Sequence, residues 1–418
     1  MTTAIRIQLC VMMFLQYFIW GAWAVTMATY LFSIGFSGTE VSLAYTTTAW
    51  AAIISPLFMG MVADRFFDGQ HVLGALHLIG AALMLWATFI TTPIFFFIVL
   101  LGYMACYMPT VALTNAISFN QMENPQTEFP PVRVFGAIGW IFAGWAIVGA
   151  GAFIYGETIE PTPIPLRIAA LCSLLMGLYS FSLPKTPPRA AGLNLTIGKL
   201  LGLDALGLLK DRAFAVFVGV SLLICIPIPF YGIFTNPFFH DAGVPNPAGL
   251  MTLGQASEVV FVLLMPFFFV RFNVKFLMLA SMVFWVGRFA LFAAGYEFNF
   301  PWMLYLGVLF HGVCFVLFIT GQIYVDNKAP AHLRSSAQGL IAVVTYGFGM
   351  AIGFFVAGAV GNIYTIEGEF QWSAIWTVPA VMALIITSGF AILFNDKSKA
   401  ARPPVAAEAS RANEPNGG

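Results

Sequence analysis

Long apolar segments recur along the whole chain, and this repetition constrains the fold more than any other feature. A helix that crosses a bilayer needs about 20 mainly apolar residues. Only 9% of the 418 residues are Asp, Glu, Lys or Arg, against ~25% in soluble domains. We therefore predict an all-α membrane protein with twelve transmembrane helices. Dividing the sequence at charges, prolines and glycine clusters gives spans at 5–33, 41–63, 70–91, 93–118, 132–154, 164–183, 213–237, 249–270, 274–295, 301–325, 335–361 and 371–394.

The longest connection between these spans divides them into two blocks of six. We expect an N-terminal six-helix bundle over 1–183, a central cytoplasmic loop over 184–212 and a C-terminal six-helix bundle over 213–396. The polar residues 397–418 are expected to form a disordered cytoplasmic tail. Two helical halves around a central site are typical of secondary transporters.

The positive charges predict the orientation of the chain in the membrane. If the N-terminus lies inside, 15 of the 18 Lys and Arg residues fall in inside segments. Because the Lys/Arg bias sets orientation, both termini are predicted to be cytoplasmic. The net charge is zero, which gives no indication of nucleic-acid binding. The five cysteines are far apart and read as free thiols, and the sequence holds no catalytic, metal-binding or phosphate-binding motif. We therefore expect neither an enzyme nor a bound cofactor.

Glu258 is the one carboxylate that falls deep within a predicted span. An acid at that depth costs at least ~2.5–3.5 kcal/mol on insertion scales, so it usually has a function. Gln255 precedes it by three residues and shares its helix face. Together they suit a polyhydroxylated or heterocyclic solute, and the carboxyl group can exchange protons between the two sides. The alternative is a structural carboxyl group that pairs with a neighbouring helix.

Polar and aromatic residues form stripes on other spans. In the fifth span, Arg133, Ala137 and Trp140 share a face; Arg133 either snorkels to the cytoplasmic surface or has a gating or substrate role. Trp140 lies two turns deeper and offers an aromatic face to a flat ring. Each stripe is either packing or the lining of a polar central cavity. The others are Gln16, Trp20 and Trp23; Tyr103, Tyr107 and Thr110; and His311, Phe315, Phe318 and Gln322.

Three further features concern helix geometry and gating. Pro227, Pro229 and Gly232 surround Tyr231 in the seventh span and predict a kink or break there. Glycines in the fifth and eleventh spans predict close helix packing, either static or sliding during transport. The loop Gly60-Met-Val-Ala-Asp64-Arg65 resembles the signature of the major facilitator superfamily, whose charges latch the halves together. Arg288, in the ninth span, is expected to pair between helices.

Long stretches of the chain resemble the bacterial nucleoside:proton symporters of the major facilitator superfamily, over nearly all of it except the tail. They are Phe14-Leu-Gln16-Tyr-Phe-Ile-Trp20-Gly-Ala-Trp23, Tyr107-Met-Pro-Thr110 with Thr114-Asn115-Ala-Ile-Ser118, Phe129-Pro-Pro-Val-Arg133-Val-Phe-Gly136, Leu201-Gly-Leu-Asp204-Ala, Gln255-Ala-Ser-Glu258, Arg288-Phe-Ala-Leu-Phe292 and Ser336-Ala-Gln-Gly339. The resemblance implies that Arg133, Gln255 and Glu258 belong to a nucleoside pocket, with Trp140 at an aromatic position. It also implies proton-driven uptake across a bacterial inner membrane.

The chain departs from that family pattern at three places. Members often carry Gln and Asn on the seventh span, where this chain has Pro229-Phe-Tyr231-Gly232, and many have an acid in the tenth, where Cys314–Phe318 has none. Ala137 replaces a familiar hydroxyl residue. The pocket is thus less polar, and Glu258 is the main candidate for proton coupling.

We predict a monomeric symporter that imports nucleosides with protons by alternating access. The predicted substrate contacts are Gln16, Trp20, Arg133, Trp140, Tyr231, Gln255, Glu258 and Phe315. Asp64 and Arg65 are the predicted gating residues. Two alternatives stay open: a carrier or facilitator for another small polar solute such as a sugar, and a sensor that binds a solute without moving it.

Overall fold

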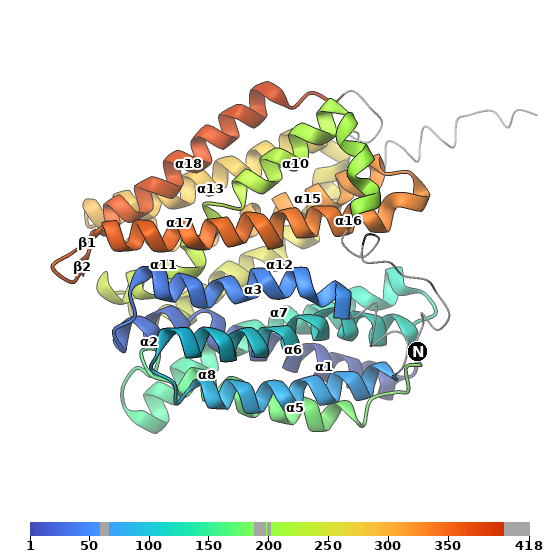
Figure 1. The fold of residues 1–418 in the computed structure, drawn as a ribbon, viewed down its shortest axis with the longest axis horizontal. Coiled ribbons are helices and arrows are strands. Elements are labelled where there is room, and N and C mark those ends of the chain that lie inside the picture. Colours follow the sequence, from blue (N-terminus) through green and yellow to red (C-terminus); the bar gives the residue numbers. More distant parts are fainter. Residues whose placement is uncertain (59–66, 188–197, 199–201, 397–418) are drawn as a thin grey trace, which may run out of the picture.

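The computed structural model in Figure 1 contains two groups of helices that lie against each other along their length. The structure describes residues 1–58, 67–187, 198 and 202–396. Helices α1 to α8 fill the lower part of the view and α10 to α18 the upper part, with α3 and α17 adjacent at the boundary (Figure 1). The N-terminus lies at one end of the long axis, and a short β-hairpin lies at the other.

The first group of helices begins near the N-terminus and ends before the central connection. Proline at the first position, as at Pro93 in α6, fits a helix start because its missing N–H would be unpaired there anyway. The elements are α1 (Thr3–Ala24), α2 (Met27–Ser33), α3 (Gly38–Phe58), α5 (Gly69–Ala87), α6 (Pro93–Asn120), α7 (Pro125–Ala150), the π-helical turn η2 (Gly151–Tyr155) and α8 (Ile164–Ser180).

The second group is also helical apart from one two-stranded hairpin, in which Thr365 pairs with Phe370. Its elements are the 3₁₀ segment η3 (Leu203–Lys210), α10 (Arg212–Ile224), α11 (Ile228–Asp241), α12 (Pro247–Arg271), α13 (Val274–Glu297), α14 (Pro301–Leu309), α15 (His311–Lys328), η4 (Ala331–Leu333), α16 (Arg334–Ala342), the π-helical η5 (Val343–Gly349), α17 (Met350–Ile363), β1 (Thr365–Ile366), β2 (Glu369–Phe370) and α18 (Trp372–Leu393).

Ten segments among the described residues are long and apolar enough to cross a membrane. They correspond to every predicted span except the second and the sixth. The sixth is the shorter apolar helix α8, of 17 residues. The second is α3, and its predicted end falls at 59–63, which lies outside the described residues. Asp64, Arg65 and the predicted tail 397–418 also lie outside them.

The first predicted span is divided into α1 and α2, because a side chain from α3 enters the helix at that point. The hydroxyl of Tyr45 donates to the Ala24 carbonyl at 2.8 Å and accepts from the Ala28 N–H at 3.2 Å. These two backbone groups therefore keep hydrogen bonds without an uninterrupted helix. A sequence scan for apolar runs has no signal for such an insertion.

The break predicted in the seventh span is confirmed. Helix α10 ends at Ile224, and α11 begins at Ile228, with Pro227 between them. Proline cannot donate a backbone hydrogen bond, and its ring clashes with the preceding turn. The chain crosses the gap in tight turns, with Ile226 N–H bonded to the Leu223 carbonyl at 3.0 Å.

The close packing predicted at the glycines of the fifth and eleventh spans is confirmed at two places, and there it joins the two groups of helices. A Cβ atom at Gly144 of α7 would lie 2.5 Å from Thr252 Cγ2 of α12. A Cβ atom at Gly358 of α17 would lie 2.5 Å from Ser42 Oγ of α3. Both contacts join a helix of one group to a helix of the other, so the interface between the halves depends on small residues.

Candidate transport site

Glu258 lies on α12 where that helix faces the other half of the molecule. Its side chain is 26% exposed, and Oε2 lies 3.5 Å from His311 Nε2 of α15. The carboxylate is also within electrostatic range of Tyr17 of α1 and Tyr346 of η5. Elements of both halves therefore flank the acid. It also lies beside His311 of a neighbouring helix, which is the kind of partner that a purely structural carboxyl group would have.

Gln255 lies one turn before Glu258 and borders a small pocket between the halves. Its Oε1 atom is buried and has no hydrogen-bond partner within the described part of the chain, so it can accept a hydrogen bond from a solute. The pocket is lined by residues of α1, α7 and α12, and by Val25 just after α1. These include Gly21, Trp140, Gly144, Met251, Thr252 and Gln255. The structure thus brings two of the predicted residues, Trp140 and Gln255, to one pocket.

Two tryptophans on opposite sides of the α1–α7 contact form an aromatic surface beside this pocket. Trp20 and Trp140 have ring centroids 5.7 Å apart with their planes inclined at 55°. Tyr107 of α6 extends the group, with its ring 5.7 Å from that of Trp20 in an edge-to-face arrangement. Aromatic faces of this kind can stack on a flat heterocycle.

Arg133 faces α1 through a contact that sequence reasoning missed. Its guanidinium carbon lies 4.2 Å from the centre of the Tyr17 ring, which is a cation–π geometry. Tyr17 is also the α1 residue within electrostatic range of Glu258. It therefore lies between the predicted basic and acidic site residues. Its spacing of three from Trp20 would have placed it on the same helix face.

Gln16 is fully buried and has its partners within the first half. Its Nε2 donates to Thr110 Oγ1 at 2.8 Å, and its Oε1 lies 2.9 Å from His77 Nε2. His77 Nδ1 lies in turn 3.0 Å from Ser173 Oγ. This network joins α1, α5, α6 and α8. The role of Gln16 as a substrate contact stays a prediction.

The remaining predicted contacts, Tyr231 and Phe315, lie in the second half. Tyr231 is buried, and its hydroxyl has no hydrogen-bond partner among the described residues. Its ring is covered by Arg288, whose guanidinium carbon lies 3.5 Å from the ring centre. Phe315 is half-buried and packs on Phe318, with ring centroids 6.0 Å apart.

Arg288 is wholly buried between helices, as expected, but its partners are not acids. Nη2 lies 3.1 Å from His311 Nδ1 of α15, and the guanidinium covers Tyr231 of α11. Its Nε and Nη1 atoms have no hydrogen-bond partner within the described residues. Contact with an aromatic face offsets part of the cost of burying this charge.

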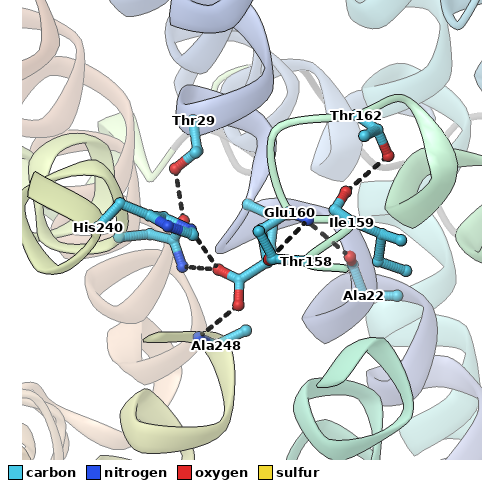
Figure 2. Close-up of polar contacts among 10 residues, drawn as sticks. Ala22, Thr29, Thr158, Ile159, Glu160, Thr162, His240 and Ala248 are labelled. Atoms are coloured by element: carbon cyan, nitrogen blue, oxygen red, sulfur yellow. Dashed lines mark hydrogen bonds and ion pairs between the residues drawn. The ribbon is translucent and has the colours of Figure 1, made fainter. Parts of the chain in front are cut away.

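At the end of the molecule remote from the N-terminus, a buried carboxylate joins the halves (Figure 2). Glu160 belongs to the loop between η2 and α8 and is 2% exposed. Its Oε2 accepts from Asn236 Nδ2 at 2.6 Å and lies 3.2 Å from His240 Nε2, both on α11. Its Oε1 accepts from the Ala248 N–H of α12 at 3.1 Å. The charge is thus paired with donors at both oxygens, as a buried carboxylate requires.

Other hydrogen bonds between the halves lie at the same end. The hydroxyl of Thr29 on α2 donates to the Asn236 side-chain oxygen, as Figure 2 also shows. The Asn362 side chain of α17 accepts from the Thr39 N–H at 3.3 Å and donates to the Thr39 hydroxyl at 3.1 Å. Within the described residues, this end is therefore closed by polar contacts between the halves.

The chemistry available at the centre is binding and proton exchange. Carboxylate, amide and guanidinium groups lie beside aromatic faces, between two groups of membrane-spanning helices. Across the described part of the chain, no three metal-ligating side chains are grouped together. The fold and this central acid define a multi-pass membrane transporter with the fold of the major facilitator superfamily.

The chain belongs to the nucleoside H⁺ symporter family, whose sequence profile matches residues 1–399. It is 43% identical to YegT of Escherichia coli (strain K12) over 398 residues, which cover 93% of each chain. It is 34% identical to the xanthosine permease and 33% identical to the nucleoside permease NupG of the same strain. These alignments cover 92% and 94% of this chain and 94% and 96% of the relatives.

Solved structures support the same assignment. The crystal structure of the nucleoside transporter NupG matches with a TM-score of 0.86 and 32% identity, covering 94% of this chain and 100% of that one. The D-xylose-proton symporter matches with a TM-score of 0.67 at 13% identity, covering 95% and 99%. The second likeness concerns the fold alone, whereas the first lies within the family.

Proposed function

We propose that this protein imports nucleosides together with protons across a bacterial inner membrane by alternating access. The observation that carries the proposal is the position of Glu258, partly buried between the two halves with Gln255 one turn away. Membership of the nucleoside H⁺ symporter family supports the choice of substrate and of coupling ion.

A nucleoside offers two kinds of surface, and the site has groups for both. The flat base can stack on Trp140, beside Trp20. The ribose hydroxyls can donate to the unpaired Oε1 of Gln255 and to an oxygen of the Glu258 carboxyl group. The Arg133–Tyr17 pair borders the same region from the first half and offers donors to the base or the sugar.

Proton coupling follows from the cost of a charged acid in a membrane. A carrier loaded with nucleoside changes the side to which its site is open more readily when the acid in that membrane-embedded site is protonated and uncharged. Glu258 would take up a proton with the nucleoside outside and release it inside. The membrane potential supplies ~2.3 kcal/mol per charge per 100 mV to this step.

The end closed by Glu160 is assigned to the periplasm, and both termini to the cytoplasm. This assignment follows the bias of Lys and Arg toward the predicted inside segments. The polar contacts between the halves then make the described conformation one that is closed to the outside. We assign the monomer as the transporting unit, because the proposed contacts come from both halves of one chain.

The experiment that tests this function is uptake of labelled uridine and adenosine into proteoliposomes with an imposed inward proton gradient. Accumulation above equilibrium that disappears with a protonophore is the expected result. Uptake independent of the gradient contradicts symport, and specific binding without flux identifies a sensor instead.

A competition experiment, in which excess sugar is added during nucleoside uptake, tests the alternative that the solute is a sugar. That alternative is motivated by the seventh and tenth spans, where Pro229-Phe-Tyr231-Gly232 and Cys314–Phe318 lack the polar residues of the family pattern. Excess sugar is expected to leave nucleoside uptake unchanged.

A further inference from the structure

Helix α15 begins at His311 because a hydroxyl from α12 interrupts the backbone ladder of the tenth span. Ser257 Oγ accepts a hydrogen bond from the Gly312 N–H at 2.9 Å. A Cβ atom at Gly312 would lie 2.5 Å from the Ser257 carbonyl oxygen, so glycine is needed for this approach. A side chain inserted into the ladder is a recognised cause of a helix break.

The same face of α12 fits closely around the His311 side chain. A Cβ atom at Gly254 would lie 3.1 Å from His311 Cβ, which leaves little space for any larger residue there. Glu258, one turn further along, is 3.5 Å from the distal ring nitrogen. The ring of Tyr231 flanks the imidazole, with centroids 5.6 Å apart. His311 is therefore held on several sides, with its distal nitrogen directed to the acid.

Arg288 fixes which nitrogen of His311 carries the hydrogen. A guanidinium group is always protonated and can only donate hydrogen bonds. Because Arg288 Nη2 lies 3.1 Å from Nδ1, Nδ1 must be the acceptor. The hydrogen of a neutral imidazole then lies on Nε2, where it points to Glu258. A second proton on the ring would have to displace Arg288.

We propose that His311 is a positioning residue for Glu258: Arg288 keeps it as a neutral donor that orients the carboxylate, and it carries no transported proton itself. This inference rests on the proposed function, in which Glu258 is the proton carrier. The proposal gives Arg288 and His311 a role in proton coupling. In the sequence, His311 indicated only part of a polar and aromatic stripe, and Arg288 only a pair between helices.

The groups around this pair come from each neighbouring element. Glu258 is faced by groups from both halves, whereas His311 is enclosed within the second half. Tyr17 of α1 and Tyr346 of η5 are within electrostatic range of Glu258, and Tyr231 of α11 and Arg288 of α13 contact His311. One step further out, Arg133 of α7 lies on the Tyr17 ring and Cys314 of α15 lies near Arg288. None of them carries a carboxyl group, so the carboxylate of Glu258, 3.5 Å from Nε2, is the group suited to accept the Nε2 hydrogen bond.

Two substitutions separate positioning from proton carriage. In His311→Gln, the side-chain amide nitrogen lies at the same number of bonds from the backbone as Nε2, so it can donate to Glu258 but cannot titrate. In His311→Asn, the amide reaches only the Nδ1 position. Both replacements are polar and neutral. His71→Gln is the control, because its side chain is 57% exposed on another helix.

The readouts are gradient-driven uptake of labelled uridine in proteoliposomes, and its dependence on pH. We expect His311→Gln to keep accumulation and His311→Asn to lose about tenfold or more, the value of a hydrogen bond to a charged group. The dependence of uptake on pH should change in His311→Asn and should match that of the unaltered protein in His311→Gln, because only the Gln amide can reach the carboxyl group to donate to it.

Equal loss in both variants overturns the inference, because it identifies a need for the titrating imidazole. Unchanged uptake in both also overturns it, because Glu258 then needs no donor. Thermal unfolding of each variant in detergent accompanies the assay, and a misfolded Asn variant is replaced by His311→Ser. Failure of the unaltered protein to respond to the gradient is a different result, which rejects the proposed function instead.

Discussion

The side-chain amide of Asn236 donates a hydrogen bond of 2.6 Å to the carboxylate of Glu160, and this contact joins the two halves at the end remote from the N-terminus. The same carboxylate binds the Ala248 N–H of α12. If the halves separate at this end during transport, all of these bonds must break together. Their strength then contributes to the balance between the conformation open at this end and the conformation open at the opposite end.

Glu160→Gln is predicted to favour the conformation open at that end. The substitution turns one carboxylate oxygen into an NH₂ group, which cannot accept the hydrogen bonds that this oxygen accepted. A buried hydrogen bond to a charged group is worth about 1.5–3 kcal/mol, so the closed conformation should lose stability. Distances between spin labels on α3 and α17 should lengthen. Glu157→Gln, an exposed acid in the same loop, is the matched control. Unchanged distances in Glu160→Gln would show that this contact does not hold the end closed.

Gly144→Ala is predicted to weaken the contact between α7 and α12. The added methyl group would meet Thr252 Cγ2 at 2.5 Å and the Ala248 carbonyl oxygen at 2.9 Å, so one helix must move. Overpacking of this kind typically costs about 1–3 kcal/mol. Gly149→Ala on the same helix is the control, because its nearest atom lies at 4.0 Å. The spin-label distances should change for Gly144→Ala only; the same change in both variants would argue against a specific contact.

Gln255→Ala is predicted to raise the KM for nucleoside about tenfold or more, with a smaller effect on the maximal rate. The substitution removes the buried Oε1 acceptor and leaves the neighbouring acid in place. Initial uptake rates over a range of uridine concentrations measure this effect. Gln8→Ala, whose amide bonds Ser182 near the N-terminus, serves as the control. An unchanged KM in Gln255→Ala removes this residue from the binding site.

Asp211 provides a pH-dependent contribution to stability at the start of α10. The Phe214 backbone N–H, at 2.9 Å, together with Lys328, at 3.1 Å, holds the pKa of this carboxyl below its ordinary value. The contribution is therefore present above that ordinary value and is lost as pH falls through the lowered pKa. Asp211→Asn keeps a capping side chain and removes the charge.

Thermal unfolding in detergent should then show Asp211→Asn slightly less stable than the unaltered protein at pH 7. The difference should be below about 1 kcal/mol for such an exposed ion pair, and it should vanish at strongly acidic pH. The exposed Asp204→Asn is the control. A difference that grows as the pH falls would reverse the sign expected for this carboxyl group.

The sequence predicted most of the architecture because bilayer thickness and charge bias act on local segments. The apolar spans, the break at Pro227 and the shared face of Gln255 and Glu258 all follow from spacing along one helix. Close packing at Gly144 also followed from residue size. Each of these features needs knowledge of only a few neighbouring residues.

The features that were missed depend on partners far apart in sequence. Tyr45 of α3 interrupts the first span at the Ala24 carbonyl. Ser257 of α12 interrupts the tenth span at Gly312, which lies 55 residues further along the chain. Glu160 was not among the predicted site residues, and its partner Asn236 lies 76 residues away. Apolar periodicity carries no information about such pairs, so three-dimensional structure was needed to find them.

The most direct test of the central claim is concentrative uptake by Glu258→Gln in proteoliposomes with an inward proton gradient. We predict that this variant loses accumulation but retains exchange of labelled for unlabelled uridine, because a neutral amide can bind the solute and cannot carry a proton. Full gradient-driven accumulation in Glu258→Gln would contradict the assignment of this residue as the proton carrier.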